Sequence, residues 1–283
     1  MIIKFQDQPS LHKMISKSLV NKFKEKLVKS DFILGNDVKI FESNFARYCN
    51  TKYAIGVSNG TDALNLALKT LNLKKNDEVI IPAMTYISTA LSVVYNGCKL
   101  RLCDINLEDG LIDIDQLKKA INKNTKCIIV VNFNGNYVDL KELTKVIPKK
   151  IKIIFDASQS HGCGENGLKA NSNAFISCYS LYPGKNLGAL GDAGIITTNS
   201  TLLYKKLLKL RNIGSSKKFI HDEIGFNNRL DTIQAAFLNI KLQKLDKQNE
   251  ARKKNALYLN QGIKNKKITI IKHKKGSVYH NYV

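Results

Sequence analysis

The sequence contains no long uninterrupted run of apolar residues. A helix that crosses a lipid bilayer needs about 20 such residues, and none of the apolar runs here approaches that length. The first residues, MIIKFQDQPSLHKM, also lack the long apolar core of a secretory signal. These absences predict a cytoplasmic protein that has no membrane partner.

Paired cysteines are missing as well. The six cysteines are scattered, and no two of them form a CxxC pair. Most have apolar neighbours, as in KCIIVV, which indicates buried free thiols in a reducing compartment. We therefore expect neither a disulfide framework nor a bound metal.

Acidic residues are scarce, with 23 Asp and Glu against 45 Lys and Arg and a net charge of +22. Such an excess can attract nucleic acid or an anionic substrate. The lysines occupy mostly polar positions of helical patterns, however, and aromatic residues do not interleave with them. We interpret the excess as solvated surface and expect no nucleic-acid partner.

Short apolar runs alternate with helical patterns from Tyr53 onward. Runs such as EVIIP and KCIIVV are four to six residues long and are followed by segments with helical spacing. This pattern predicts buried parallel strands joined by crossover helices, hence an α/β fold whose mostly parallel central sheet has helices on both faces. Two further strands, AFISCYS and AGIITTN, flank the turn YPGKN.

The pattern divides the chain into two domains. Residues 1–235 form the large domain, including an N-terminal helix over about 10–30. A long helix is predicted over about 232–259, and residues 268–272 and 277–283 are predicted to be strands of a smaller α+β domain that begins at 236. Because the chain stops inside the last pattern, we expect the smaller domain to be incomplete.

Three segments carry residues suited to chemistry. Lys185 follows Pro-Gly between two predicted strands, where partial burial would lower its pKa and make it a nucleophile toward aldehydes. Asp156 ends the apolar run IKIIF, at the edge where open parallel sheets bind ligands, and a protonated pyridine nitrogen would partner it. In GVSNGTDALNLAL, an Asn-Gly-Thr turn opens a helix, which favours a phosphate site.

Each segment alone also has an ordinary explanation: an exposed loop lysine, a capping aspartate and a capped turn. Together they supply a phosphate cradle, a carboxylate for a ring nitrogen and a lysine for an aldehyde. Pyridoxal 5'-phosphate (PLP) requires these three groups, so the combination favours a PLP enzyme.

Five ordered motifs support a closer assignment. SNGTDALNLAL, EVIIPAMTYISTA, DASQSHG, SLYPGKNLGALGDAG and GFNNRLDTIQAAFL resemble the successive signatures of the DegT/DnrJ/EryC1/StrS sugar aminotransferases. The resemblance extends from about Asp31 to the last residue. It implies the aspartate-aminotransferase fold (PLP transferase fold type I), a homodimer with active sites at the subunit interface, PLP as cofactor and glutamate as the usual amino donor.

The same resemblance implies roles for individual residues. Lys185 matches the Schiff-base lysine, and Asp156 matches the partner of the pyridinium nitrogen. The remaining cofactor contacts are Gln159 beside the ring hydroxyl, Gly60 and Thr61 in the phosphate-binding turn, Ser180 as a hydroxyl donor to that phosphate, Tyr86 stacked on the ring, and Asn227 at the neighbouring subunit's phosphate.

Two features bear on the branch of the family. A lysine at position 185 argues against the branch that has histidine there and catalyses dehydration. The run Phe219-Ile220-His221, ahead of the GxNxRLD motif, resembles the branch that aminates dTDP-linked 3-keto-6-deoxy sugars, and makes His221 and Arg229 candidates for substrate contact. The segment NFNGN at 132–136 departs from the HLYG-like stretch of many members.

These observations predict an aminotransferase that moves an amino group from glutamate to a nucleotide-linked keto-deoxy-sugar, with dTDP-3-keto-6-deoxyhexose favoured, in amino-sugar biosynthesis. A 4-keto-sugar aminotransferase of the same family is one alternative, and a PLP enzyme acting on free amino acids is another. A third is a non-catalytic basic protein of this fold that binds nucleic acid or a partner.

The interpretation of the charge can be tested directly. Binding to mixed-sequence DNA, followed by fluorescence anisotropy, should be weak and should vanish by roughly 0.15 M salt, where the screening length is about 8 Å. Sub-micromolar binding that persists at this salt concentration would favour the nucleic-acid alternative, because it would require many direct phosphate contacts.

Overall fold

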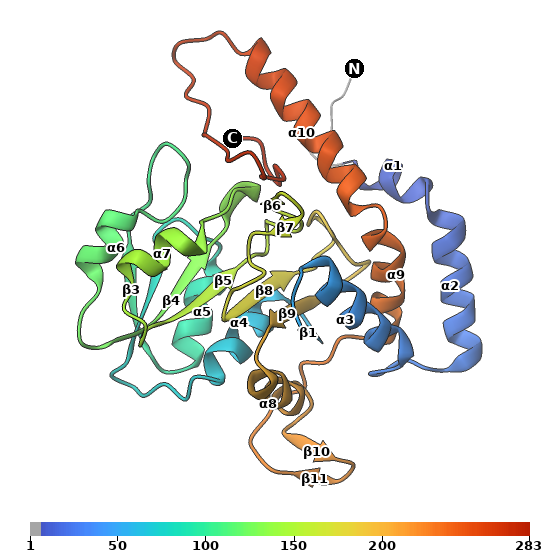
Figure 1. The fold of residues 1–283 in the computed structure, drawn as a ribbon. Helices are drawn as coiled ribbons and strands as arrows, with labels where there is room; N and C mark the ends of the chain where they lie inside the picture. Colours follow the sequence, from blue (N-terminus) through green and yellow to red (C-terminus); the bar gives the residue numbers. More distant parts are fainter. Residues whose placement is uncertain (1–6) are drawn as a thin grey trace.

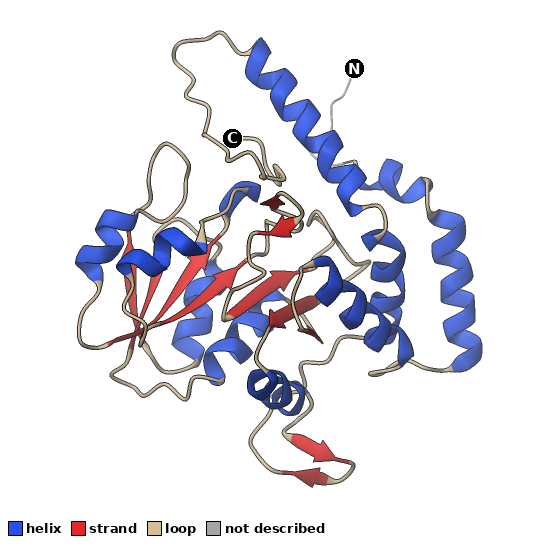
Figure 2. Ribbon diagram, viewed as in Figure 1, coloured by secondary structure: helices blue, strands red, loops and turns tan. Residues whose placement is uncertain are grey.

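A seven-stranded sheet forms the centre of the computed structural model, which describes residues 7–283, and helices cover both of its faces (Figures 1 and 2). The strand order is β1-β9-β8-β5-β4-β2-β3. Only β9 runs antiparallel to its neighbours, so the predicted mostly parallel α/β sheet is confirmed. The strands are β1 (Tyr53–Val57), β2 (Glu78–Pro82), β3 (Lys99–Cys103), β4 (Thr125–Val131), β5 (Lys152–Asp156), β8 (Ile176–Ser180) and β9 (Gly194–Thr198).

Alternation along the strands supplies a core on each face of the sheet. In β2, Val79 and Ile81 pack with the helices of one face, whereas Ile80 packs with those of the other. The first face carries α4 (Gly60–Lys69), α5 (Ile87–Tyr95) and α8 (Thr201–Arg211). The second carries α3 (Asn36–Tyr48), α6 (Ile114–Ala120), α7 (Leu140–Val146) and α9 (Thr232–Leu242).

Two predicted helices are interrupted. The helix expected over 10–30 is divided into α1 (Gln8–Lys13) and α2 (Ser16–Lys29). The helix expected over 232–259 is divided into α9 and α10 (Leu245–Gly262) by a turn at Gln243 and Lys244, where Lys244 N donates to Lys241 O at 3.0 Å. The break lets α9 pack against α3 while α10 extends away from the sheet (Figure 1).

The prediction of strands at 268–272 and 277–283 was wrong. Neither segment forms a strand, and each instead bonds to a loop of the sheet domain. Lys272 N donates to Glu108 O at 2.7 Å, and Val278 N donates to Gly135 O at 2.8 Å. The domain boundary at residue 235 stays a prediction.

Smaller elements complete the description. They are the 3-10 turn η1 (Phe133–Gly135), the hairpin of β6 (Gly164–Glu165) and β7 (Leu168–Lys169), and the hairpin of β10 (Ser215–Lys217) and β11 (Ile220–His221), which projects from the body of the molecule (Figure 1). Across residues 7–283, no helix has the length and apolar character that a membrane crossing needs.

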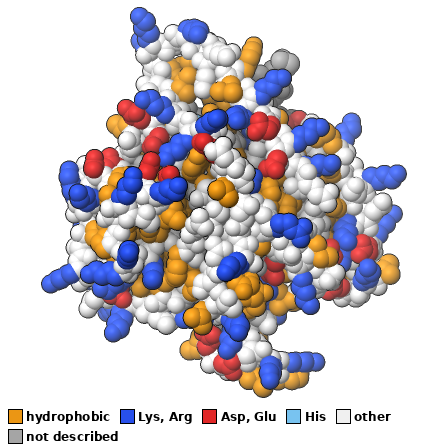
Figure 3. All heavy atoms as spheres, viewed as in Figure 1, with side chains coloured by type: hydrophobic (Ala, Val, Ile, Leu, Met, Phe, Trp, Pro, Cys, Tyr) orange, Lys and Arg blue, Asp and Glu red, His pale blue; other side chains and the backbone are white. Residues whose placement is uncertain are grey.

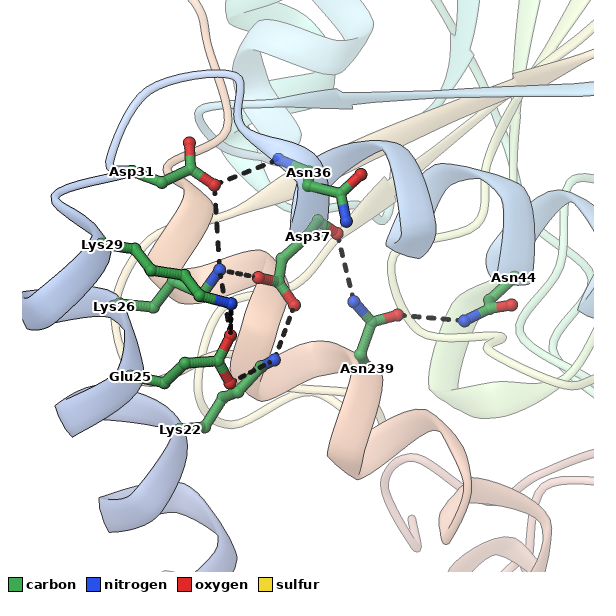
Figure 4. A network of polar contacts seen from close by, with 9 residues as sticks. All are labelled: Lys22, Glu25, Lys26, Lys29, Asp31, Asn36, Asp37, Asn44 and Asn239. Atoms are coloured by element: carbon green, nitrogen blue, oxygen red, sulfur yellow. Dashed lines mark hydrogen bonds and ion pairs between the residues drawn. The ribbon is translucent and has the colours of Figure 1, made fainter.

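Buried ion pairs attach α2 to the sheet domain (Figure 4). Lys26 and Asp37 are 2% and 4% exposed and form an ion pair, and Lys22 adds a second contact to Asp37 at 3.3 Å. Asn239 Nδ2 of α9 donates to the backbone oxygen of Asp37 at 3.1 Å, so α2, α3 and α9 meet at this residue. Packing these charges is favourable only while each retains its partner.

Replacing Asp37 should therefore destabilise the fold. Asp37→Ala removes the nearest and most buried counter-charge of Lys26 and leaves it only Glu25 and Asp31, each 3.8 Å away. We therefore expect a loss of roughly 3 kcal/mol in the free energy of unfolding, measured in urea. Lys29→Ala is the control, because its pair with Glu25 is 60% exposed on the lysine side, and such pairs contribute at most about 1 kcal/mol. Equal losses in the two variants would contradict this account.

Candidate functional site

A cavity of about 710 Å³ lies at the carboxyl ends of the parallel strands. The loops that follow β1, β2, β4, β5 and β8 all contribute to its wall, as expected for a ligand site of an open parallel sheet. The sequence-predicted residues that line it are Gly60, Thr61, Tyr86, Asp156, Gln159, Ser180 and Lys185. It is also lined by residues to which the sequence assigned no role, among them Ser88, Tyr95, Phe133, Ser158, Tyr182 and Asp192.

Three predicted residues lie outside this cavity. Asn227 is exposed and pairs with Asn212 in an isolated bridge, while Arg229 Nη1 donates to Asn212 Oδ1 at 3.4 Å. His221 is exposed on β11, with Nδ1 2.9 Å from Ile213 O. A single chain therefore does not bring these side chains to the cavity, and their roles stay predictions.

Lys185 lies in a tight turn between β8 and β9. Its backbone N–H donates to Tyr182 O at 2.9 Å, and a Cβ on Gly188 would lie 2.3 Å from Pro183 O, so only glycine fits there. Burial lowers the pKa of Lys185 because it disfavours the charged ammonium, and the negative charge of Asp156 partly opposes this effect. At a given pH, a larger fraction of Lys185 is therefore the neutral, nucleophilic amine than for an exposed lysine.

Asp156 is held at the end of β5 by neutral donors. It is 6% exposed; Thr89 Oγ1 donates to Oδ2 at 3.0 Å and Ser158 N donates to Oδ1 at 3.1 Å. The ion pairs formed within residues 7–283 do not include this carboxylate. A buried carboxylate that faces a cavity and forms no ion pair of its own suits a positively charged ligand atom.

The sequence interpretation missed Thr89. It is fully buried on α5, and its hydroxyl also lies 2.8 Å from Oγ1 of Thr85, which precedes the N-cap of that helix. No local sequence signal marks this contact, because Thr89 and Asp156 are 67 residues apart.

The N-terminus of α4 forms an anion site on the same wall. Asn59 caps the helix by accepting from Asp62 N at 2.8 Å. The N–H groups of the residues before Asp62 have no acceptor inside the helix, as in any helix. A Cβ on Gly60 would lie 2.6 Å from Ser180 Cβ, so glycine permits the close approach of that serine. Thr61 Oγ1 adds a second hydroxyl, 2.7 Å from Ser88 Oγ. Backbone donors and hydroxyls so arranged fit a phosphate.

Gln159 is oriented by the loop at 132–136. Its Oε1 accepts from Asn134 N at 2.6 Å, and Asn134 adopts a left-handed backbone conformation with φ 55°. Because this bond uses the amide oxygen, the amide NH₂ of Gln159 is available as a donor in the cavity. The NFNGN segment thus positions Gln159, and its Phe133 lines the cavity directly.

Comparison with known proteins identifies the family. The sequence profile of the DegT/DnrJ/EryC1/StrS aminotransferase family matches residues 13–283. The chain belongs to this family. The resemblance inferred from the five motifs is thereby confirmed.

Two relatives are dTDP-sugar transaminases. Identity is 39% over 285 residues to the dTDP-3-amino-3,6-dideoxy-alpha-D-galactopyranose transaminase of Aneurinibacillus thermoaerophilus, covering all of this chain and 78% of that protein. Identity is 37% over 222 residues to the dTDP-3-amino-3,4,6-trideoxy-alpha-D-glucose transaminase of Streptomyces venezuelae, covering 78% of this chain. The matched region spans only 59% of the length of that relative.

Solved structures agree with the fold. The Streptomyces venezuelae protein DesV, in complex with a ketimine intermediate, superposes with a TM-score of 0.95 at 32% identity, covering 99% of this chain and 76% of that one. An Escherichia coli GDP-4-keto-6-deoxy-D-mannose-3-dehydratase with bound hydrated PLP superposes at 0.88 with 26% identity, covering 93% and 75% of the two chains. The PLP transferase fold implied by the motifs is therefore confirmed.

The lowered pKa of Lys185 predicts how its acetylation rate depends on pH. In a pH series of competitive acetylation read by peptide mass spectrometry, Lys185 should reach half of its maximal rate at a lower pH than the exposed lysines, because burial depresses its pKa. Asp156→Asn should lower that midpoint further, since it removes the negative charge that favours the ammonium. A midpoint for Lys185 above that of the exposed lysines would contradict the assigned cause.

Proposed function

We propose that this protein is a PLP-dependent aminotransferase that transfers an amino group from glutamate to a nucleotide-linked keto-deoxy-sugar. The observation that carries the proposal is the convergence of Lys185, Asp156 and the N-terminus of α4 on one cavity, in a chain of this aminotransferase family. Both dTDP-sugar relatives are named for a 3-amino sugar, which supports amination at C3 of a dTDP-linked substrate.

The residues present fit PLP. Gly60, Thr61 and Ser180 would hold its phosphate, and the buried carboxylate of Asp156 would hold its protonated ring nitrogen. Gln159 would donate to the ring hydroxyl, and Tyr86, which is 70% exposed at the mouth, would stack on the ring. When bound, PLP supplies an electron sink for the carbon that loses a proton.

Lys185 would hold the aldehyde carbon of the cofactor covalently. Its lowered pKa favours the neutral amine that this bond requires. As a free amine, Lys185 Nζ would serve as the general base that removes a proton from the substrate carbon and as the general acid that returns it. Asp156 would support the same chemistry, because its negative charge would favour a proton on the ring nitrogen.

A second copy of this chain would complete the site. Three tyrosines at the cavity, Tyr86, Tyr95 and Tyr182, are 70%, 63% and 58% exposed, and exposed aromatic side chains are typical of interface cores. Asn227 lies away from the cavity of its own chain, so its predicted phosphate contact requires a partner. These observations support a homodimer with shared active sites.

The alternative of a nucleic-acid-binding protein has less support. On the face in Figure 3, Lys and Arg side chains are spread among uncharged surface rather than gathered in one stripe. Nucleic-acid sites usually concentrate basic residues on one face or along one helix.

The cofactor role of Lys185 can be tested by borohydride trapping. The full chain incubated with PLP and then reduced should carry a PLP adduct on the peptide that contains Lys185, and Lys185→Ala should lose it. Unchanged melting would show that the variant remains folded. A reducible adduct at wild-type yield in Lys185→Ala would assign the nucleophile to another lysine.

Asp156→Asn is the matched variant, since it keeps the side-chain volume and removes the charge. It should retain the trapped adduct yet lose most turnover with glutamate and a panel of dTDP- and UDP-linked 3-keto and 4-keto sugars. Near-normal transamination by Asp156→Asn would show that Asp156 has only a structural, capping role. A preference of the wild-type chain for a 4-keto sugar would favour the alternative of a 4-keto-sugar aminotransferase.

A further inference from the structure

A network of buried amides lies directly behind Lys185. Asn186, the next residue, and Asn249 of α10 are 5% and 6% exposed, and buried amides of this kind need partners. Asn186 Nδ2 donates to Asn249 Oδ1 at 2.9 Å and to Val278 O at 3.3 Å. The network therefore ties the Lys185 turn to α10 and to the segment at 277–283, which lie far from it in the sequence.

The network has one consistent set of donors. It begins at the backbone oxygen of His161, which can only accept and which receives Asn249 Nδ2 at 2.8 Å. Asn249 must then present its oxygen to Asn186, and Asn186 must use its NH₂ there. Asn186 Oδ1 is left facing His280 Nδ1 at 2.8 Å. His280 must donate this bond, so Nδ1 carries a proton, and in the neutral ring Nε2 then carries a lone pair.

Two glycines make room for these contacts. Gly162 has φ +96°, and a Cβ there would lie 2.7 Å from Asn249 Nδ2. Gly135 has φ +87°, and a Cβ there would lie 2.4 Å from His280 N. Any larger residue at either position would therefore clash with the network or with the backbone that carries it.

The surroundings keep His280 neutral. Burial and the positive charges of Lys185 and Arg252 lower the pKa of His280 to about 3. His161, fully buried beside Tyr179, has its pKa lowered to about 3 by burial, Lys185 and His280. A charged imidazole at either place would repel the ammonium of Lys185, and a neutral one does not.

We propose that Asn186, Asn249 and His280 are positioning residues, which fix the Lys185 turn from behind. In this network Asn186 and Asn249 hold His280 in the neutral tautomer protonated on Nδ1. The positioning role rests on the proposed function of Lys185, whereas the tautomer does not.

The tautomer can be observed in the full chain without cofactor. The chain has five histidines, so nitrogen-15 labelling of histidine gives few ring signals, and the signal lost in His280→Asn identifies His280. We expect Nδ1 protonated, Nε2 unprotonated and no titration between roughly pH 5 and 8. In Asn186→Asp, a carboxylate faces the ring, so the pKa of His280 should rise. A proton on Nε2, or titration of the wild-type ring in this range, would overturn the proposed network.

The positioning role is tested by the rate of borohydride-trappable PLP capture at Lys185. His280→Phe keeps the bulk but loses the donor and should slow capture by roughly tenfold or more. His280→Asn restores an N–H at the equivalent position and should recover most of the wild-type rate. Lys275→Ala, exposed on the same segment, is the control and should behave as wild type.

The outcomes separate the two proposals. Equal capture rates in His280→Phe, His280→Asn and wild type would refute the positioning role. The positioning role would also be refuted if His280→Phe lowered the capture rate only in proportion to a lowered melting temperature and His280→Asn did not restore the rate. General destabilisation would then explain the effect. Failure of the wild-type chain to form any adduct at Lys185 would instead refute the proposed function and leave the tautomer result standing.

Discussion

The antiparallel direction of β9 is the constraint on which the site depends. β8 ends at Ser180 on the carboxyl edge of the sheet, and β9 begins at Gly194 on that same edge because it runs back beside β8. A parallel β9 would need a crossover of a dozen or more residues over one face. The antiparallel pairing instead keeps the whole connection above the edge, and Lys185 with it, in the same cavity as Asp156 at the end of β5.

The electrostatics of the cavity follow from that placement. Burial disfavours the ammonium of Lys185 and the charge of Asp156 partly opposes this, so the pKa of Lys185 lies below its usual value. Asp156 is fixed by Thr89 and Ser158, which donate hydrogen bonds without neutralising its charge. The carboxylate thus remains available to a cationic ligand atom while its orientation is already set.

The C-terminal part of the chain is joined to this centre by polar contacts. Asn136, which is fully buried, donates to Lys272 O at 3.0 Å and accepts from Ser277 Oγ at 2.9 Å, so the NFNGN loop receives the segment that follows α10. The same loop orients Gln159 through Asn134 N. A departure from the common family pattern at 132–136 is therefore accommodated by contacts with the far end of the chain.

The sequence by itself determined the strands of the central sheet, its mostly parallel character and the chemistry of Lys185, Asp156 and the α4 N-terminus, because each depends on residues adjacent in the chain. The strand order and the antiparallel direction of β9 were decided only by the tertiary structure. Only the tertiary structure decided that 268–272 and 277–283 are not strands, since that depends on whether a free sheet edge lies beside them. The same holds for the buried network: Asn186 lies 63 residues from Asn249 and 94 from His280, and no local pattern reports which amides meet. Side-chain hydrogen bonds between distant segments are fixed by packing, and packing is a property of the folded chain.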